Sequence, residues 1–193
     1  MGDAARDRWA RAAGFTILEI LIYSVVAAIL SVPIGMIVVG MSRASAEGDM
    51  MSKVLERNRS SLQRIDAEYR KSMKGTTAIL NGGKALQFTS AGAFNGVGPA
   101  VGPVIRYEIR LAPGEALNGR DDNGNGLIDE GSLFRVDVTN NKEVLLTNCL
   151  NAGTSSFAAA GTGVTVTLVT SGRTHRAPNE TDVTRTLTIY PRN

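Results

Sequence analysis

Cysteine and histidine are almost absent from this chain of 193 residues, which contains only Cys149 and His175. A single cysteine cannot form an internal disulfide, and a single histidine cannot form a paired-histidine metal site. The chain also lacks a Gly-x-Ser-x-Gly motif and a phosphate-binding glycine loop, and neither Cys149 nor Ser155-Ser156 has an evident base partner. We therefore predict that the protein is not an enzyme.

Aromatic residues are also scarce, at 5% of the chain, and the net charge is only +3. Nucleic-acid binding usually depends on a basic patch interleaved with aromatic side chains, and the sequence has no such patch. No nucleic-acid partner is predicted.

Charged residues are missing from residues 15–41, with one exception. This stretch reads FTILEILIYSVVAAILSVPIGMIVVGM, and Glu19 is its only charge. It exceeds the roughly 20 apolar residues that a membrane-spanning helix needs. A weakly basic flank with Arg6, Arg8 and Arg11 precedes it, and the positive-inside rule keeps such a flank in the cytoplasm. The sequence therefore predicts a single pass through the cytoplasmic membrane, with everything after the span outside the cytoplasm.

The region after the span changes from a helical to a strand pattern. Residues 42–74 are rich in charge, and their apolar residues recur with the period of a helix, broken only by Asn58. We predict an amphipathic continuation of the apolar helix that ends near Gly75. In VIRYEIRL at 104–111 the apolar residues alternate with charged ones, which is typical of a half-buried antiparallel strand. Further strands are predicted at 86–89, 133–139, 143–147, 164–170 and 185–190.

Turn signals separate these strands. Asn81-Gly82-Gly83 predicts a turn, and Asn140-Asn141 predicts a tight hairpin turn between two strands. The glycine- and proline-rich segment AGAFNGVGPAVGP at 91–103 predicts a loop. The predicted fold class is therefore α+β: a long N-terminal helix followed by an antiparallel, strand-rich head at 75–193.

Glu19 needs an explanation, because an isolated carboxylate in an apolar environment is costly. A plain signal anchor leaves it unexplained. A secretory signal peptide is another interpretation, since Ala44-Ser45-Ala46 is an A-x-A cleavage site, but the apolar stretch is longer than the usual length of about 7 to 15 residues. A core helix of a soluble protein would not be apolar on every side over such a length.

The residues Gly14-Phe15-Thr16-Ile17-Leu18-Glu19 resemble the cleavage and methylation signal of type IV pilins and of type II secretion pseudopilins. In that signal a short charged leader ends in Gly, Phe follows, and an acid lies four residues later in a long apolar helix. The resemblance implies that prepilin peptidase removes residues 1–14 and methylates the new amino terminus at Phe15. It also implies that Glu19 pairs with the positive amino terminus of a neighbouring subunit in a filament. A pilin-like head follows the helix in that family.

A second motif lies in RDDNGNGLIDEGS at 120–132. Oxygen-bearing side chains alternate and are followed by Gly126, which matches the first half of an EF-hand-like calcium loop, D-x-[DN]-x-[DN]-G. Ser132 occupies the position of the closing bidentate Glu, so another residue must close the site. A solvated turn between two strands is the alternative. The predicted calcium ligands are Asp121, Asn123, Asn125, Leu127 through its carbonyl, Asp129 and Glu130.

These features together predict a structural subunit, a minor pseudopilin of a type II secretion pseudopilus or a subunit of a related type IV filament. Its expected partners are prepilin peptidase, other pilin-like subunits and the cytoplasmic membrane. The alternative is a membrane-anchored or secreted binding module that depends on calcium.

Overall fold

The computed structural model describes residues 16–124, 127–174 and 177–192. The chain divides into two compact units, residues 1–47 and 48–193, and each is described separately here. One helix, α1 (Ile17–Tyr69), runs through the boundary between them. The boundary lies a few residues beyond the predicted end of the apolar segment at residue 41.

The helix in the first unit is apolar and exposed. Ile17–Ser45 is long and apolar enough to cross a membrane, and none of its most apolar part is buried by the rest of the chain. Pro33 lies inside the helix, which continues on both sides of it. The hydroxyls of Ser24, Ser31 and Ser42 each donate a hydrogen bond to a backbone carbonyl three or four residues earlier. Polar groups that are satisfied within the helix in this way are tolerated in lipid.

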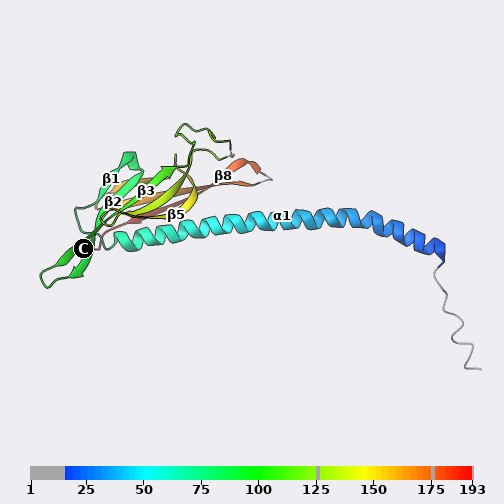
Figure 1. The fold of residues 1–193 in the computed structure, drawn as a ribbon, viewed down its shortest axis with the longest axis horizontal. Helices are drawn as coiled ribbons and strands as arrows, with labels where there is room; N and C mark the ends of the chain where they lie inside the picture. The colour runs from blue at the N-terminus through cyan, green and yellow to red at the C-terminus, as the bar shows by residue number, and fades with distance from the viewer. Residues whose placement is uncertain (1–15, 125–126, 175–176, 193) are drawn as a thin grey trace, which may run out of the picture. The chain divides into compact units, whose positions relative to one another are not determined.

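The second unit contains the rest of α1 and an antiparallel sheet (Figure 1). Within the described residues the sheet has eight strands in the order β1-β2-β3-β4-β5-β7-β6, and β8 pairs with β7. A short 3-10 turn, η1 (Asn81–Gly83), joins the first two strands. The strands are β1 (Ala78–Leu80), β2 (Ala85–Phe94), β3 (Pro99–Leu111), β4 (Glu130–Asp137), β5 (Lys142–Asn151), β6 (Ser156–Ala160), β7 (Gly163–Thr174) and β8 (Ala177–Ile189).

The amphipathic part of α1 packs its apolar face against this sheet. Leu62, Ile65 and Tyr69 are buried in one core with side chains from most of the strands. Phe88 of β2 lies edge-on to the ring of Tyr69, with 5.4 Å between ring centroids. It also stacks on Tyr107 of β3. Each large apolar side chain buried in this way contributes roughly 1.5–3 kcal/mol.

A charged cluster also joins α1 to the sheet. Arg135 donates from Nε to both carboxylate oxygens of Glu68, at 3.0 and 2.8 Å, and the Tyr107 hydroxyl donates to Glu68 Oε2 at 2.9 Å. Burial raises the pKa of the Tyr107 phenol well above its usual range, and the negative charge of Glu68 raises it further. Burial lowers the pKa of Arg135, but its hydrogen bond and ion pair with Glu68 outweigh that effect, so the net shift is upward.

Three predictions about the elements need correction. The helix ends at Tyr69 and not near Gly75, because residues 71–73 pair with β2 through Ala91 N–Lys71 O and Met73 N–Thr89 O hydrogen bonds. The segment 91–103 is largely strand, forming the end of β2 and the start of β3. Two strands, β1 and β6, were not predicted. The turn at Asn140-Asn141 and the α+β class are confirmed.

Candidate functional site

Glu19 lies in the first turn of α1, where it forms a capping box with Thr16. The Thr16 backbone N–H and hydroxyl donate to Glu19 Oε2 at 3.0 and 3.1 Å, and the Glu19 N–H donates to Thr16 Oγ1 at 3.2 Å. Such a box satisfies backbone N–H groups that have no partner within the helix, and a carboxylate is also favoured at the positive end of the helix dipole. Gly14 and Phe15, the predicted processing residues, lie outside the described residues.

The capping box was not anticipated, although Thr16-Ile17-Leu18-Glu19 has the T-x-x-E spacing that signals one. It gives Glu19 two hydrogen-bond donors from its own chain. No Lys or Arg forms an ion pair with Glu19 among the residues that the structure describes. The charge of this carboxylate therefore has no opposite charge within this part of the chain.

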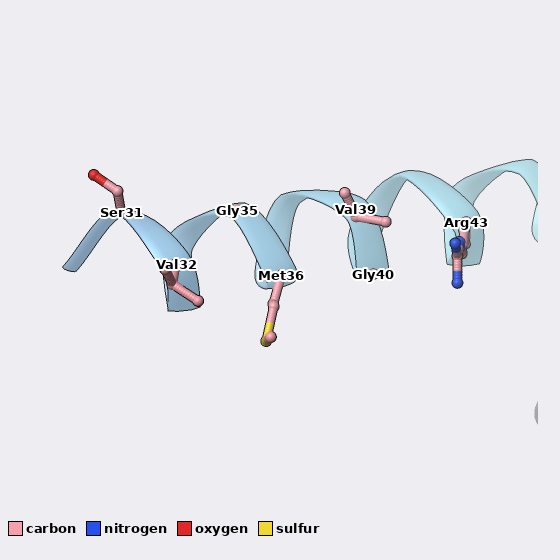
Figure 2. Close-up of a pocket in the computed structure, with 7 residues that line it drawn as sticks. All are labelled: Ser31, Val32, Gly35, Met36, Val39, Gly40 and Arg43. Carbon is pink, nitrogen blue, oxygen red and sulfur yellow. The ribbon is translucent and has the colours of Figure 1, made fainter. Parts of the chain in front are cut away.

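A shallow groove runs along the apolar helix further from its N-terminus. It is lined by Ser31, Val32, Gly35, Met36, Val39, Gly40 and Arg43. Figure 2 shows Val32 and Met36 projecting from the same side of the helix, with Gly35 and Gly40 as positions without a side chain. A Cβ added at Gly35 or Gly40 would meet nothing within 4 Å. The groove therefore lies on the exposed surface of the helix, and no other described part of the chain covers it.

The loop between β3 and β4 contains the predicted calcium ligands. Two of its carboxylates, those of Asp129 and Asp122, accept hydrogen bonds from other residues of the loop. Both oxygens of Asp129 accept hydrogen bonds from backbone N–H groups, at 3.1 Å from Asn118 and at 3.1 and 3.2 Å from Gly119. Asp122 Oδ2 accepts from the Ala116 N–H and from Asn118 Nδ2. The carboxylates of Asp129 and Asp122 therefore hold residues 116–119 in position within the loop.

The other acids of this region form hydrogen bonds with Asn123 and Gly124. Asp121 Oδ1 accepts from the Gly124 N–H at 2.7 Å, and Asn123 Nδ2 lies 3.4 Å from Glu130 Oε1. Glu115 Oε1 accepts from the Asn123 N–H at 3.2 Å, while its Oε2 is buried and has no hydrogen-bond partner among the described residues. An unsatisfied buried carboxylate oxygen fits a cation ligand. Glu115 was not among the predicted ligands, because it lies six residues before the motif begins.

Of the predicted ligands, Asn123 and Glu130 are in side-chain contact through the 3.4 Å hydrogen bond between Nδ2 and Oε1. Leu127 is described within the loop, whereas Asn125 lies outside the described residues. Among the residues that are described, no three acidic, histidine or cysteine side chains converge closely enough to hold a metal ion. His175, the only histidine, also lies outside that part of the chain.

Lys84, which lies between η1 and β2, forms a clamp on the β5–β6 loop. Its ammonium donates to three backbone carbonyls, those of Ala152 at 2.5 Å, Gly153 at 3.0 Å and Ser155 at 2.8 Å. Burial lowers the pKa of Lys84, and the nearby charge of Asp129 opposes this shift. Asp129 contacts the same loop, because its carbonyl accepts from the Ala152 N–H at 2.7 Å. The β5–β6 loop is thus held from two sides, by the ammonium of Lys84 and by the carbonyl of Asp129 in the β3–β4 loop. The sequence carries no local signal for this arrangement.

Comparison of the chain with protein-family models, with curated proteins and with solved structures finds no match.

Proposed function

We propose that this chain is a pilin-like structural subunit, with a minor pseudopilin of a type II secretion pseudopilus as the first choice and a type IV pilus subunit as the second. The order of its parts supports the proposal: an exposed apolar helix is followed by an amphipathic segment and an antiparallel sheet domain. In this proposal the role is structural and not enzymatic.

The observation that carries the proposal is the place of Glu19. It lies in the first turn of a helix whose following residues are apolar and exposed. Among the residues that the structure describes, only Thr16 donates hydrogen bonds to its carboxylate. A carboxylate at the edge of a membrane or a helix bundle becomes tolerable when an opposite charge meets it. In the proposed filament this charge is the methylated amino terminus at Phe15 of a neighbouring subunit.

Processing and location follow from the same proposal. Prepilin peptidase cuts between Gly14 and Phe15 on the cytoplasmic side. The span then stays in the cytoplasmic membrane with the sheet domain outside the cytoplasm, until the subunit joins other pilin-like subunits in the filament. The apolar helix would serve as anchor first and as part of the filament core later.

Intact mass and N-terminal sequencing of the protein from its native membrane test the processing step. We expect a start at Phe15 bearing a methyl group. A start at Glu47 would mean that the Ala44-Ser45-Ala46 site is used and the helix is discarded, which would favour a secreted, calcium-dependent binding module. A start at Met1 would mean a simple signal anchor. Either of these two results would overturn the filament proposal.

Two substitutions separate the charge of Glu19 from its capping role. Glu19→Gln keeps an acceptor for the Thr16 N–H, since Gln also serves in capping boxes, but it removes the charge. Thr16→Ala removes the capping hydroxyl and keeps the charge. We expect Glu19→Gln to abolish co-purification with other pilin-like subunits and Thr16→Ala to preserve it. If Thr16→Ala alone abolished co-purification, the helix cap and not the charge would be the requirement.

We also propose that the β3–β4 loop binds calcium. The alternating oxygen ligands of the motif and the unsatisfied Glu115 oxygen support this. Asp121, Asn123, Glu115 and Glu130 are the side chains that would hold the ion. The ion would supply a positive centre that fixes the loop between two strands, in a chain that cannot form a disulfide.

Calcium binding is measured on the full chain in detergent by equilibrium dialysis and by thermal unfolding. We expect calcium at millimolar concentration to raise the melting temperature, because extracellular calcium modules bind with dissociation constants of about 10⁻⁴ to 10⁻³ M. Asp121→Asn should remove the effect. Asp49→Asn, an exposed acid on α1 that is not part of the loop, is the matched control. Equal stabilisation of both variants by calcium would contradict the assignment.

A further inference from the structure

A cavity with charged and hydroxyl groups in its lining lies in the second unit, away from the β3–β4 loop in sequence. Its volume is about 630 Å³, which falls within the range of small-molecule sites, roughly 300–1,000 Å³. Three segments that are far apart in the sequence form it: the turn after α1, the β6–β7 turn and the tail after β8. The lining residues are Lys74, Gly75, Thr77, Thr162, Pro191 and Arg192.

Hydrogen bonds fix the turn that forms one wall of the cavity. The Thr76 hydroxyl donates to the Met73 carbonyl at 2.7 Å, and Gly75 between them has a φ of 74°. The hydroxyls of Thr77 and Tyr69 lie 3.1 Å apart and share a hydrogen bond. Because Tyr69 is buried in the core, this bond ties the cavity wall to the core of the sheet domain.

The other two walls are fixed as well. The Arg192 N–H donates to the carbonyl of Arg70 at 3.3 Å, which holds the tail against the end of α1. Gly163, just after Thr162, is packed so closely against β8 that an added Cβ would lie 2.3 Å from the Ile189 carbonyl oxygen. The β6–β7 turn and the tail are therefore held next to each other, so the three walls have defined positions.

Among the residues that the structure describes, the lining of the cavity carries positive charge and no negative charge. Lys74 and Arg192 are the two charged side chains, and Thr77 and Thr162 add hydroxyls. The acids on the last turns of α1 are engaged elsewhere, since Asp66 pairs with Arg70 and Glu68 pairs with Arg64 and Arg135. An anion in the cavity would therefore meet two cations with no competing carboxylate from the lining.

We propose that this cavity binds a small oxyanion, a carboxylate or a phosphate. A guanidinium presents paired N–H donors that match the two oxygens of such a group, and an ammonium adds a second positive charge. The Thr162 hydroxyl can donate to a further oxygen of the anion, and the Thr77 hydroxyl can do so when Tyr69 is the donor in their shared hydrogen bond. This assignment does not depend on the filament proposal, and it concerns a surface that no part of that proposal uses.

The test uses the full chain in an uncharged detergent at low salt, with equilibrium dialysis against radiolabelled inorganic phosphate and, separately, radiolabelled citrate. We expect saturable binding of at least one of the two anions. In Lys74→Gln/Arg192→Gln the affinity should fall by at least about tenfold, because two charge-assisted hydrogen bonds are lost. Arg59→Gln/Lys142→Gln is the matched control, since it removes the same charge from exposed positions outside the cavity.

Binding of phosphate alone would identify the ligand as a phosphate, and binding of citrate alone would identify it as a carboxylate. No saturable binding of either anion to the unmodified protein would overturn the proposal. The proposal would also fail if the control pair weakened binding as much as the cavity pair, because binding would then reflect net charge only. Unchanged melting temperatures of both variants show that the comparison is made between folded proteins.

Discussion

Asn58 lies on the face of α1 where the helical period calls for an apolar residue, and the structure explains this exception. Its side chain is fully buried, its Nδ2 donates to the Thr170 hydroxyl, and its Oδ1 accepts from the Thr147 hydroxyl at 2.8 Å. One asparagine therefore satisfies the polar groups of two strands, β5 and β7. A buried polar group on a helix is tolerated when such partners meet it.

This trio gives the first prediction. Asn58→Leu should lower the free energy of unfolding by about 1–3 kcal/mol, because the hydroxyls of Thr147 and Thr170 stay buried without their partner. Urea unfolding of the detergent-solubilised chain measures the change. The triple variant Asn58→Leu/Thr147→Val/Thr170→Val should regain much of the loss, since it removes all three polar groups. A single variant as stable as the unmodified protein would show that the trio does not stabilise the fold.

The second prediction concerns pH and Tyr107. Burial and Glu68 raise the pKa of this phenol in the folded protein, whereas in the unfolded chain it ionises near its ordinary pKa of about 10. Above that pH the unfolded state has released a proton that the folded state retains, so stability falls as pH rises. Tyr107→Phe should therefore make the decrease in unfolding free energy between about pH 8 and pH 11 smaller.

The control is Tyr190→Phe, because Tyr190 is exposed and its phenol has no such burial. Urea unfolding at a series of pH values, with tyrosinate absorbance as a second readout, measures both variants. If the pH dependence of Tyr107→Phe matched that of the control, Tyr107 would not be the group responsible.

At the scale of elements, the alternation of apolar and polar residues located the centres of six strands. These predictions rested on apolar side chains that face the core, and Ile105, Tyr107 and Ile109 of β3 are indeed buried. Alternation said nothing about β6, because the sequence SFAAA has few side chains with a strand preference. It also failed for residues 91–103, where glycine and proline suggested a loop.

Glycine in that segment allows the backbones of the two paired strands to approach closely, and it is not a sign of a loop. A Cβ at Gly102 would lie 2.6 Å from the Ser90 carbonyl oxygen of the paired strand, so only glycine allows this approach. The β2–β3 register is irregular at the same place. Such close backbone contact is a property of the paired strands, and a single sequence offers no direct signal for it.

A third prediction follows for this hairpin. Gly102→Ala should lower the free energy of unfolding by about 1–3 kcal/mol, because the backbone of β2 must move to make room for the new Cβ. Gly98→Ala is the control, since an added Cβ there would meet nothing within 4 Å. Thermal unfolding of the two variants measures the difference. Equal melting temperatures of the two variants would mean that the β2–β3 hairpin accommodates the new Cβ without losing stability.

The candidate sites divide in the same way between local and non-local signals. The capping box at Thr16 and Glu19 and the calcium-type motif are both local patterns that can be recognised within a few residues. Glu115 and the Lys84 clamp depend on segments brought together by the sheet, because Lys84 meets carbonyls some 70 residues further along the chain. Contacts at such separation are set by strand order, which the residue pattern alone did not predict.

At the scale of the whole molecule, the buried core belongs to the second unit. Every buried residue that the structure describes lies between Asn58 and Ile189, and the apolar helix of the first unit adds none. The stability of the sheet domain should therefore be independent of the apolar helix of the first unit, since burial of apolar surface is the main favourable contribution to folding.

The last prediction tests this independence. A fragment of residues 48–193 should be soluble without detergent, elute as a monomer in gel filtration and unfold cooperatively. Its melting temperature should lie within a few degrees of the value for the full chain in detergent, because the removed residues contribute no buried side chain among those described. A matched fragment of residues 64–193 lacks Asn58 and Leu62 and should be clearly less stable. If the 48–193 fragment aggregated or melted without cooperativity, the sheet domain would need the apolar helix or a partner subunit in order to fold.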